Sequence, residues 1–167
     1  MTTSKREDVS QSEKAYIDSL ITKYLNIRTI HFGDSPREAI RYDKRPQMYG
    51  GEGVVYLLQM FAEGELVNNR IGAYMILPTS DDSIGFHTHG SRNEQEIYVI
   101  LEGVGQYLEK DSWESPEKKH EVVKGNITTM MGKGFHGIKN IGESPLIIFV
   151  ITTNEKKVRS VSVDTGI

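Results

Sequence analysis

Residues 83–103 read SIGFHTHGSRNEQEIYVILEG and combine a histidine pair with the strongest strand pattern in the chain. His87 and His89 are two residues apart, so on a β-strand both imidazoles lie on one face and can reach a single point. Glu96 follows at the start of the strand pattern, where its carboxylate adds an oxygen ligand and a negative charge. These three residues predict a metal site built on β-strands.

A third histidine completes this predicted site. His136 opens a later strand pattern that continues to Asn140. Antiparallel strands that are distant in sequence can meet inside one barrel, so we expect His136 to join the first three residues. His31 and His120 match no such spacing, and we interpret them as structural or surface residues.

Short strand patterns also make up most of the remaining chain. Ile and Val number 29 against 13 Leu and Ala, a balance that favours a pleated sheet. No helical pattern of 12 residues separates two strands, which excludes a βαβ sheet and leaves an all-β antiparallel barrel or jelly roll. The predicted strands are residues 27–32, 54–61, 71–77, 96–101, 104–109, 121–124, 127–131, 136–140, 146–152 and 158–163.

The N-terminal part has a different pattern. Ser10 and Glu13 form a capping box, and apolar residues at helical spacing follow it through Leu25, which predicts a helix that packs on the sheet. We divide the chain into a disordered N-terminus (1–9), a helix and strand extension (10–49) and the barrel (50–167). The isolated strand pattern at 27–32 is expected to pair with a neighbouring subunit and form a homodimer.

The metal-site residues resemble the cupin superfamily. The family's first motif, G(X)5HXH(X)3-4E(X)6G, is similar to the segment that contains His87, His89, Glu96 and Gly103. Six residues separate His89 from Glu96, where the motif allows three or four. This longer gap resembles that of the archaeal cupin-type phosphoglucose isomerases.

The second cupin motif, G(X)5PXG(X)2H(X)3N, is similar to Gly125, His136 and Asn140, with Met131 and Lys133 in place of its Pro and second Gly. The resemblance implies a cupin-type antiparallel β-barrel, also called a double-stranded β-helix or jelly roll, here with an N-terminal helix. It also implies four metal ligands: His87, His89, Glu96 and His136.

The carboxylate ligand could be Glu96 or Glu94, because Glu94 satisfies the shorter spacing of the motif. Counting back from Gly103 selects Glu96. Strand alternation agrees, since it places Glu96 and Tyr98 on one face of the strand. We favour Glu96 and keep Glu94 as the alternative.

The predicted ligand set limits the choice of metal. The chain has no cysteine, so three imidazoles and one carboxylate favour one divalent transition metal among Mn, Fe, Co, Ni, Cu and Zn over Ca or Mg. Four protein ligands on an octahedral ion leave two adjacent positions for a small molecule with neighbouring oxygens.

Three further residues are candidates for catalysis. Tyr98 shares the predicted inward face with Glu96, so its hydroxyl could contact a substrate. Glu94 could act as a general acid or base, and Arg92 could bind an anionic substrate. Solvated loop positions are the simpler interpretation of Glu94 and Arg92, and a core position that of Tyr98.

Charge and hydropathy exclude other classes of function. The net charge is −3 and the Lys and Arg residues are scattered, so nucleic acid is not an expected partner. No apolar run is long enough to cross a bilayer, and we expect a cytoplasmic protein without a membrane partner. We predict a metal-binding enzyme of the isomerase, decarboxylase or dioxygenase type that acts on a small oxygen-rich organic acid or sugar derivative. The alternative is a non-catalytic module that binds a small molecule or carbohydrate.

Overall fold

The computed structural model describes residues 5–27, 30–32, 35–62, 65–66, 71–90, 94–131 and 133–154. These residues contain one α-helix, α1 (Gln11–Ile21), and one short 3-10 segment, η1 (Met48–Gly50). None of the described helices has the length and apolar character needed to span a membrane. The strands are β1 (Ile30–Phe32), β2 (Ser35–Arg37), β3 (Arg41–Pro46), β4 (Val54–Gln59), β5 (Gly72–Leu77), β6 (Ser83–His87), β7 (Glu94–Glu102), β8 (Val104–Lys110), β9 (Lys118–Val123), β10 (Ile127–Met131), β11 (Phe135–Asn140) and β12 (Leu146–Asn154).

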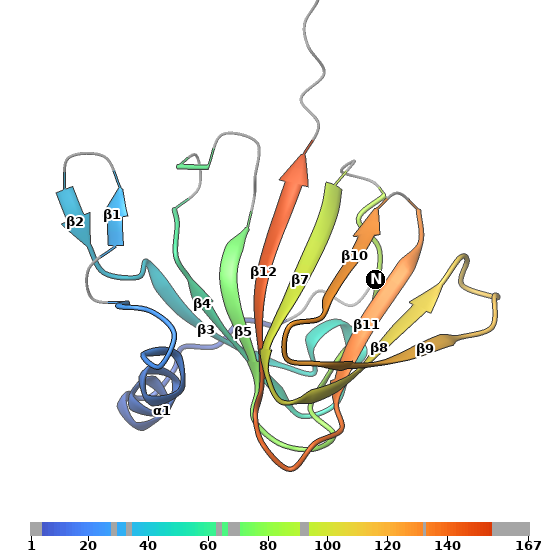
Figure 1. Cartoon of the computed structure of the whole chain (residues 1–167), viewed down its shortest axis with the longest axis horizontal. Helices are drawn as coiled ribbons and strands as arrows, with labels where there is room; N and C mark the ends of the chain where they lie inside the picture. The colour runs from blue at the N-terminus through green and yellow to red at the C-terminus, as the bar shows by residue number, and fades with distance from the viewer. Residues whose placement is uncertain are drawn as a thin grey trace, which may run out of the picture.

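Two antiparallel sheets form the body of the molecule (Figure 1). The larger has the order β10-β7-β12-β5-β4-β3, and the smaller has the order β6-β11-β8-β9. Side chains from both sheets form one buried core, in which Leu57 and Ile148 of the larger sheet join Ile84 and Ile138 of the smaller. This arrangement confirms the predicted all-β jelly-roll fold with an N-terminal helix.

The sheets are not closed into a barrel, which corrects one part of the prediction. Within the described residues, no strand of the six-stranded sheet is hydrogen-bonded to a strand of the four-stranded sheet. The chain passes from β9 to β10 through a short turn, in which Asn126 Oδ1 accepts from the backbone N–H of Val123 at 2.8 Å. The two strands then belong to different sheets, so a cleft remains between them.

Nine of the ten predicted strands correspond to observed strands, with ends that differ by a few residues. The tenth, at 158–163, lies outside the described residues. The prediction missed β2, β3 and β6. Strand β3 reads RYDKRP and lacks an apolar alternation, because its inward-facing Asp43 is buried beside Arg41, with Nε–Oδ1 at 2.8 Å, and beside Arg6 at 3.5 Å.

The extension is more closely joined to the sheets than the sequence predicted. Strand β3 pairs with β4, so part of the 10–49 segment belongs to the six-stranded sheet. Within residues 5–9, Glu7 and Lys44 exchange two backbone hydrogen bonds of 2.9 and 3.0 Å, so this segment lies beside β3. Strand β1 pairs with β2 in a separate hairpin, where it was expected to pair with a neighbouring subunit.

Helix α1 packs against the outer face of the six-stranded sheet, where Ile17 and Ile21 are fully buried against Leu58 and Ile76. The predicted capping box is present, with Ser10 Oγ accepting from the Glu13 N–H and Glu13 accepting from the Ser10 N–H. The Glu13 carboxylate also accepts from Lys44 Nζ at 2.6 Å and from Tyr56 OH at 2.8 Å.

Glu13 therefore both caps helix α1 and joins it to the sheet through hydrogen bonds. The hydrogen bond from Lys44, helped by those from Ser10 and Tyr56, lowers the pKa of Glu13 from 4.5 to about 2.

We predict that Glu13→Ala lowers the free energy of unfolding by about 2 kcal/mol, because it removes half of the capping box and two contacts with the sheet. The depressed pKa means that the ionised Glu13 contributes its full stability above pH 4.5 and loses it as the pH falls toward 2. Urea unfolding between pH 6 and 2 should therefore show a shallower acid dependence for Glu13→Ala than for the wild type. Exposed Glu114 provides the control, since Glu114→Ala should keep the wild-type curve; an acid dependence of Glu13→Ala equal to that of the wild type would contradict the role of Glu13.

Candidate metal centre

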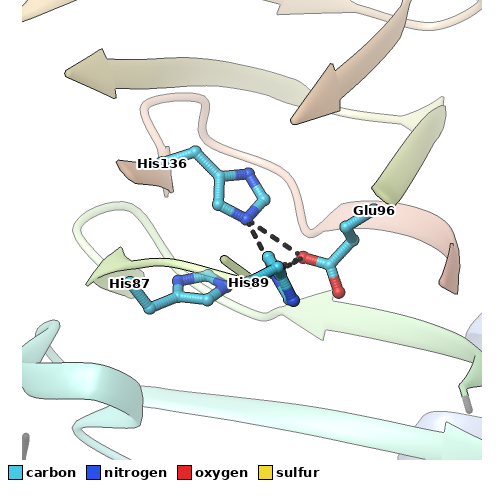
Figure 2. Close-up of side chains that lie close together, drawn as sticks. All are labelled: His87, His89, Glu96 and His136. Carbon is cyan, nitrogen blue, oxygen red and sulfur yellow. Dashed lines mark hydrogen bonds and ion pairs between the residues drawn. The ribbon is translucent and has the colours of Figure 1, made fainter. Parts of the chain in front are cut away.

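Four side chains converge between the two sheets (Figure 2). Nε2 of His89 lies 3.2 Å from Oε2 of Glu96 and 3.2 Å from Nε2 of His136. Nε2 of His136 lies 3.2 Å from the same Glu96 oxygen, and Nε2 of His87 lies 3.6 Å from it. One potential ligand atom from each residue lies within 4.8 Å of all the others. The structure thus brings together the four residues that the sequence selected.

Both sheets contribute to this cluster. His87 at the end of β6 is the strand partner of His136 on β11, and Glu96 comes from β7 of the larger sheet. A register shift follows His136, and a Cβ at Gly137 would lie 2.6 Å from the backbone oxygen of Ile84. Glycine at 137 therefore allows β11 to approach β6 closely where the imidazoles meet.

Each histidine also makes an outward contact through Nδ1. His87 Nδ1 lies 3.1 Å from the Gly85 carbonyl, and His89 Nδ1 lies 3.0 Å from the Glu94 carboxylate. His136 Nδ1 lies 3.0 Å from the hydroxyl of Tyr107. These contacts orient the rings and direct all three Nε2 atoms toward Glu96, which is the usual arrangement of imidazoles around a metal.

Burial and hydrogen bonding together determine which side chains of the cluster are charged. Burial alone would raise the pKa of Glu96, but hydrogen bonds from the three imidazoles hold it well below its usual value. Burial lowers the pKa of His136 from 6.5 to about 4. For His89, burial opposes protonation, but the carboxylates of Glu96 and Glu94 together raise the pKa. An anionic carboxylate thus lies beside a neutral His136.

The donor set fits a divalent transition metal. When His89 donates its Nδ1–H to Glu94, the neutral ring has a lone pair on Nε2, and this lone pair faces the Glu96 carboxylate at 3.2 Å. A lone pair and a carboxylate oxygen repel each other at this distance. A cation between Nε2 of His89 and the Glu96 carboxylate would turn that repulsion into attraction. Adjacent ligands at about 2.1 Å from an ion are roughly 3 Å apart, close to the separations observed.

The candidate catalytic residues have different surroundings. Tyr98 is buried and its ring stacks on His136, with ring centroids 5.3 Å apart. Glu94 is also buried at His89, so the solvated-loop interpretation of Glu94 is wrong. Arg92 lies outside the described residues, and its role stays a prediction.

Two tyrosines that contact the cluster were not predicted from the sequence. Tyr107 contacts His136 through its hydroxyl, and Tyr49 stacks on His87 with ring centroids 4.3 Å apart. Tyr49 has a left-handed backbone, at φ 54°, and a Cβ at Gly85 would lie 2.3 Å from its carbonyl oxygen. The inward face of β8 could have indicated Tyr107, whereas no sequence signal indicates the turn that positions Tyr49.

A small cavity of about 30 Å³ adjoins the cluster. His87, His89 and Glu96 line one side of it. Most of the other lining side chains are apolar, with two phenol rings among them: Met48, Tyr49, Leu57, Ile71, Met75, Tyr98 and Val150. A cavity of this size favours a very small ligand.

Comparison with known proteins relates the fold of this chain to solved structures. No protein-family model and no curated protein matches the chain. The structure of a predicted oxalate decarboxylase from Thermotoga maritima is 26% identical, with a TM-score of 0.60 over 68% of this chain and 92% of that one. A cupin superfamily protein from Desulfitobacterium hafniense is 14% identical, with a TM-score of 0.47 over 60% of this chain and 78% of that one. The chain has a cupin fold.

The cupin fold of this chain is also similar to that of Drosophila melanogaster CENP-C, solved bound to CAL1. The two chains are 11% identical, and the match covers 86% of this chain and 100% of that one at a TM-score of 0.57. At this identity the similarity shows a common fold alone.

The geometry separates the roles of the two neighbouring glutamates. We predict that Glu96→Gln weakens binding of a divalent metal by 100-fold or more, because it removes the carboxylate at the centre of the cluster. Glu94→Gln should weaken binding by about 10-fold or less, since its amide oxygen can still accept the Nδ1–H of His89. Calorimetric titration of the purified variants with Co²⁺ or Mn²⁺ would measure both; a larger loss for Glu94→Gln would assign the ligand to Glu94.

Proposed function

We propose that this cupin is a metal-dependent enzyme whose substrate is a small organic acid. One divalent transition metal would be held by His87, His89, Glu96 and His136. The proposal rests on one observation. Three imidazoles, each held at Nδ1 by a neighbouring group, converge with one carboxylate beside a small cavity.

The cavity favours an acid of two or three carbons over a sugar derivative. Its volume of about 30 Å³ and its apolar walls leave little room for a chain of hydroxyl groups. Among the described lining residues there is no Lys or Arg, so the metal would compensate most of the substrate's charge. Arg92, four residues before Glu96 in the sequence, is our candidate for the remaining charge. Similarity to a predicted oxalate decarboxylase supports an acid such as oxalate or a 2-oxo acid.

Residues of the chain would have separate roles around an acid that chelates the metal. A bound divalent ion supplies Lewis-acid polarisation of the chelating oxygens. Burial and the neighbouring Glu96 carboxylate, to which it donates a hydrogen bond, raise the pKa of Tyr98 well above its usual value, so its hydroxyl stays protonated at the wall of the cavity. Glu94 acts through His89, as a positioning residue.

Decarboxylation is the reaction class that this arrangement supports best. Loss of CO₂ from oxalate leaves formate once a proton reaches the remaining carbon, and the apolar walls limit the access of water to that carbon. Isomerase and dioxygenase chemistry are the other branches of the prediction, and a non-catalytic binding module is the alternative function.

Removal of the metal should destabilise the protein. An ion present at 100 times its dissociation constant adds about 2.7 kcal/mol, which corresponds to roughly 5 to 10 °C in melting temperature. We expect EDTA to lower the melting temperature by this amount and one equivalent of metal to restore it. Glu96→Gln is the control, because its melting temperature should respond little to EDTA; an EDTA-insensitive wild type would contradict the metal site.

Turnover tests the enzymatic proposal directly. We predict that the metal-loaded protein converts oxalate or a 2-oxo acid to CO₂, and that Tyr98→Phe lowers kcat by about 10-fold with a smaller change in metal affinity. Release of ¹⁴CO₂ from labelled acids would measure the rate. Saturable binding of the acids without any product would favour the binding module.

A further inference from the structure

Strand β10 is an edge strand whose free side is unprotected. Its five residues, Ile127–Met131, include no charge, no proline and no glycine. In the described part of the chain, β10 is hydrogen-bonded to β7 along one side only. Ile127 is 67% exposed, more than any other large apolar side chain among the described residues. An uncharged edge of this kind is normally covered in a native protein, because it can otherwise pair with other chains.

The backbone of β10 offers three hydrogen-bonding positions on this free side. The carbonyl of Asn126 accepts from the Ile100 N–H of β7 at 2.9 Å, so it points toward β7. Backbone groups of successive residues in a strand point alternately to its two sides. The N–H and C=O groups of Ile127, Thr129 and Met131 therefore point away from β7.

The free side of β10 borders an open cleft between the two sheets. One part of the cleft, about 440 Å³, is lined by Tyr107 and Thr128 among others, and a second part of about 400 Å³ shares Glu109 and Thr129 with it. The hydroxyl of Tyr107 lies 3.0 Å from Nδ1 of His136. The cleft thus reaches a side chain that contacts a candidate metal ligand.

The described part of the chain ends close to this edge. Asn154, the last residue of β12, pairs with Glu94 of β7, and Met131, the last residue of β10, pairs with Gln95. Both β12 and β10 run antiparallel to β7, so they end at the same end of the sheet. The free side of β10 is three strand spacings from β12, which is about 14 Å. Residues 155–158 lead from β12 to the next residue over a distance of up to about 17 Å, so they are long enough to reach it.

We propose that residues 159–163 of the same chain pair antiparallel with β10 and cover the cleft. This segment belongs to the strand pattern predicted at 158–163, which lies outside the described residues. A chain that turns back after β12 runs opposite to β10, as antiparallel pairing requires. The short link places Arg159 opposite Met131 and Val163 opposite Ile127. The added strand closes the cleft over Tyr107, and this closure is independent of the proposed enzymatic function.

The side chains of the two segments are complementary in this register. Directly opposed residues of an antiparallel pair point to the same face, so Val163 covers the exposed side chain of Ile127, and Val161 lies on the same face. Ser162 lies opposite Thr128, and a pair of this kind can form a hydrogen bond between strands. A shift of one residue would instead place Ser162 against the exposed isoleucine.

Charge also favours this segment as the occupant of the cleft. Among the residues that line the cleft, three carry carboxylates and one carries an ammonium group: Glu109, Asp111, Glu121 and Lys110. Residues 156–159 include three basic side chains and no acidic one. The chain that would lead into the cleft is therefore opposite in charge to most of the ionisable groups around it.

Disulfide formation tests the register, because the chain has no cysteine of its own. Thr129 and Val161 would form a hydrogen-bonded pair with Cα atoms about 5.5 Å apart, which is within the range of a disulfide. The variant Thr129→Cys/Val161→Cys should therefore form a disulfide within one chain on oxidation, as detected by mass spectrometry and non-reducing electrophoresis. The matched control Thr129→Cys/Ser160→Cys should oxidise about 10-fold more slowly, because the side chain at 160 points to the other face.

Amide exchange of the full chain tests the pairing without added cysteines. The N–H groups of Thr129 and Met131 should exchange slowly in the wild type, as measured by NMR. Val161→Pro should accelerate this exchange by about 10-fold or more, because proline removes the N–H that would donate to β10. Val158→Pro is the matched control, since residue 158 lies in the link and its N–H is not needed. Protection should be equal at low and high protein concentration, because the pairing lies within one chain.

Four results would overturn the proposal. Two concern the cysteine variants: a disulfide that joins two chains, or equal oxidation rates of the two double variants. The others concern the amides of Thr129 and Met131: rapid exchange in the wild type, or protection that rises with protein concentration. A concentration-dependent protection or a disulfide between chains would assign the cover of β10 to another molecule.

Discussion

The convergence of three imidazoles on the buried carboxylate of Glu96 is the interaction on which the site depends. A carboxylate that is only 5% exposed is costly unless positive or hydrogen-bonding groups surround it. The imidazoles come from β6, from the residues just beyond it and from β11, all in or beside the smaller sheet, while Glu96 comes from the larger. The polar cluster therefore joins the two sheets in a region where most neighbouring side chains are apolar.

A ring of outward contacts makes this convergence specific. The Gly85 carbonyl, the Glu94 carboxylate and the Tyr107 hydroxyl each hold one Nδ1 atom. With one ring nitrogen engaged, each imidazole presents the other to the centre. The same contacts explain why a residue that satisfies the spacing of the motif, Glu94, need not be a ligand.

The sequence predicted that these four side chains converge because strand periodicity determines the direction of a side chain. Glu96 and Tyr98 alternate with outward residues along β7, as the sequence indicated, and both line the cavity. Strand β3 was missed because a buried Asp43 among arginines replaces the apolar alternation on which strand recognition depends. Tyr49 was missed because its position depends on a left-handed turn and on a close approach to Gly85. The open cleft between β9 and β10 depends on how far two sheets diverge, and local sequence patterns contain no signal for that distance.

The central claim is that His87, His89, Glu96 and His136 hold one metal ion. X-ray absorption at the edge of the metal, measured on protein purified without chelator and quantified by elemental analysis, tests it most directly. The account predicts one ion per chain, with three imidazole nitrogens and at least one carboxylate oxygen at about 2.1 Å. Protein without a bound metal, or a metal whose spectrum lacks three imidazole ligands, would contradict it.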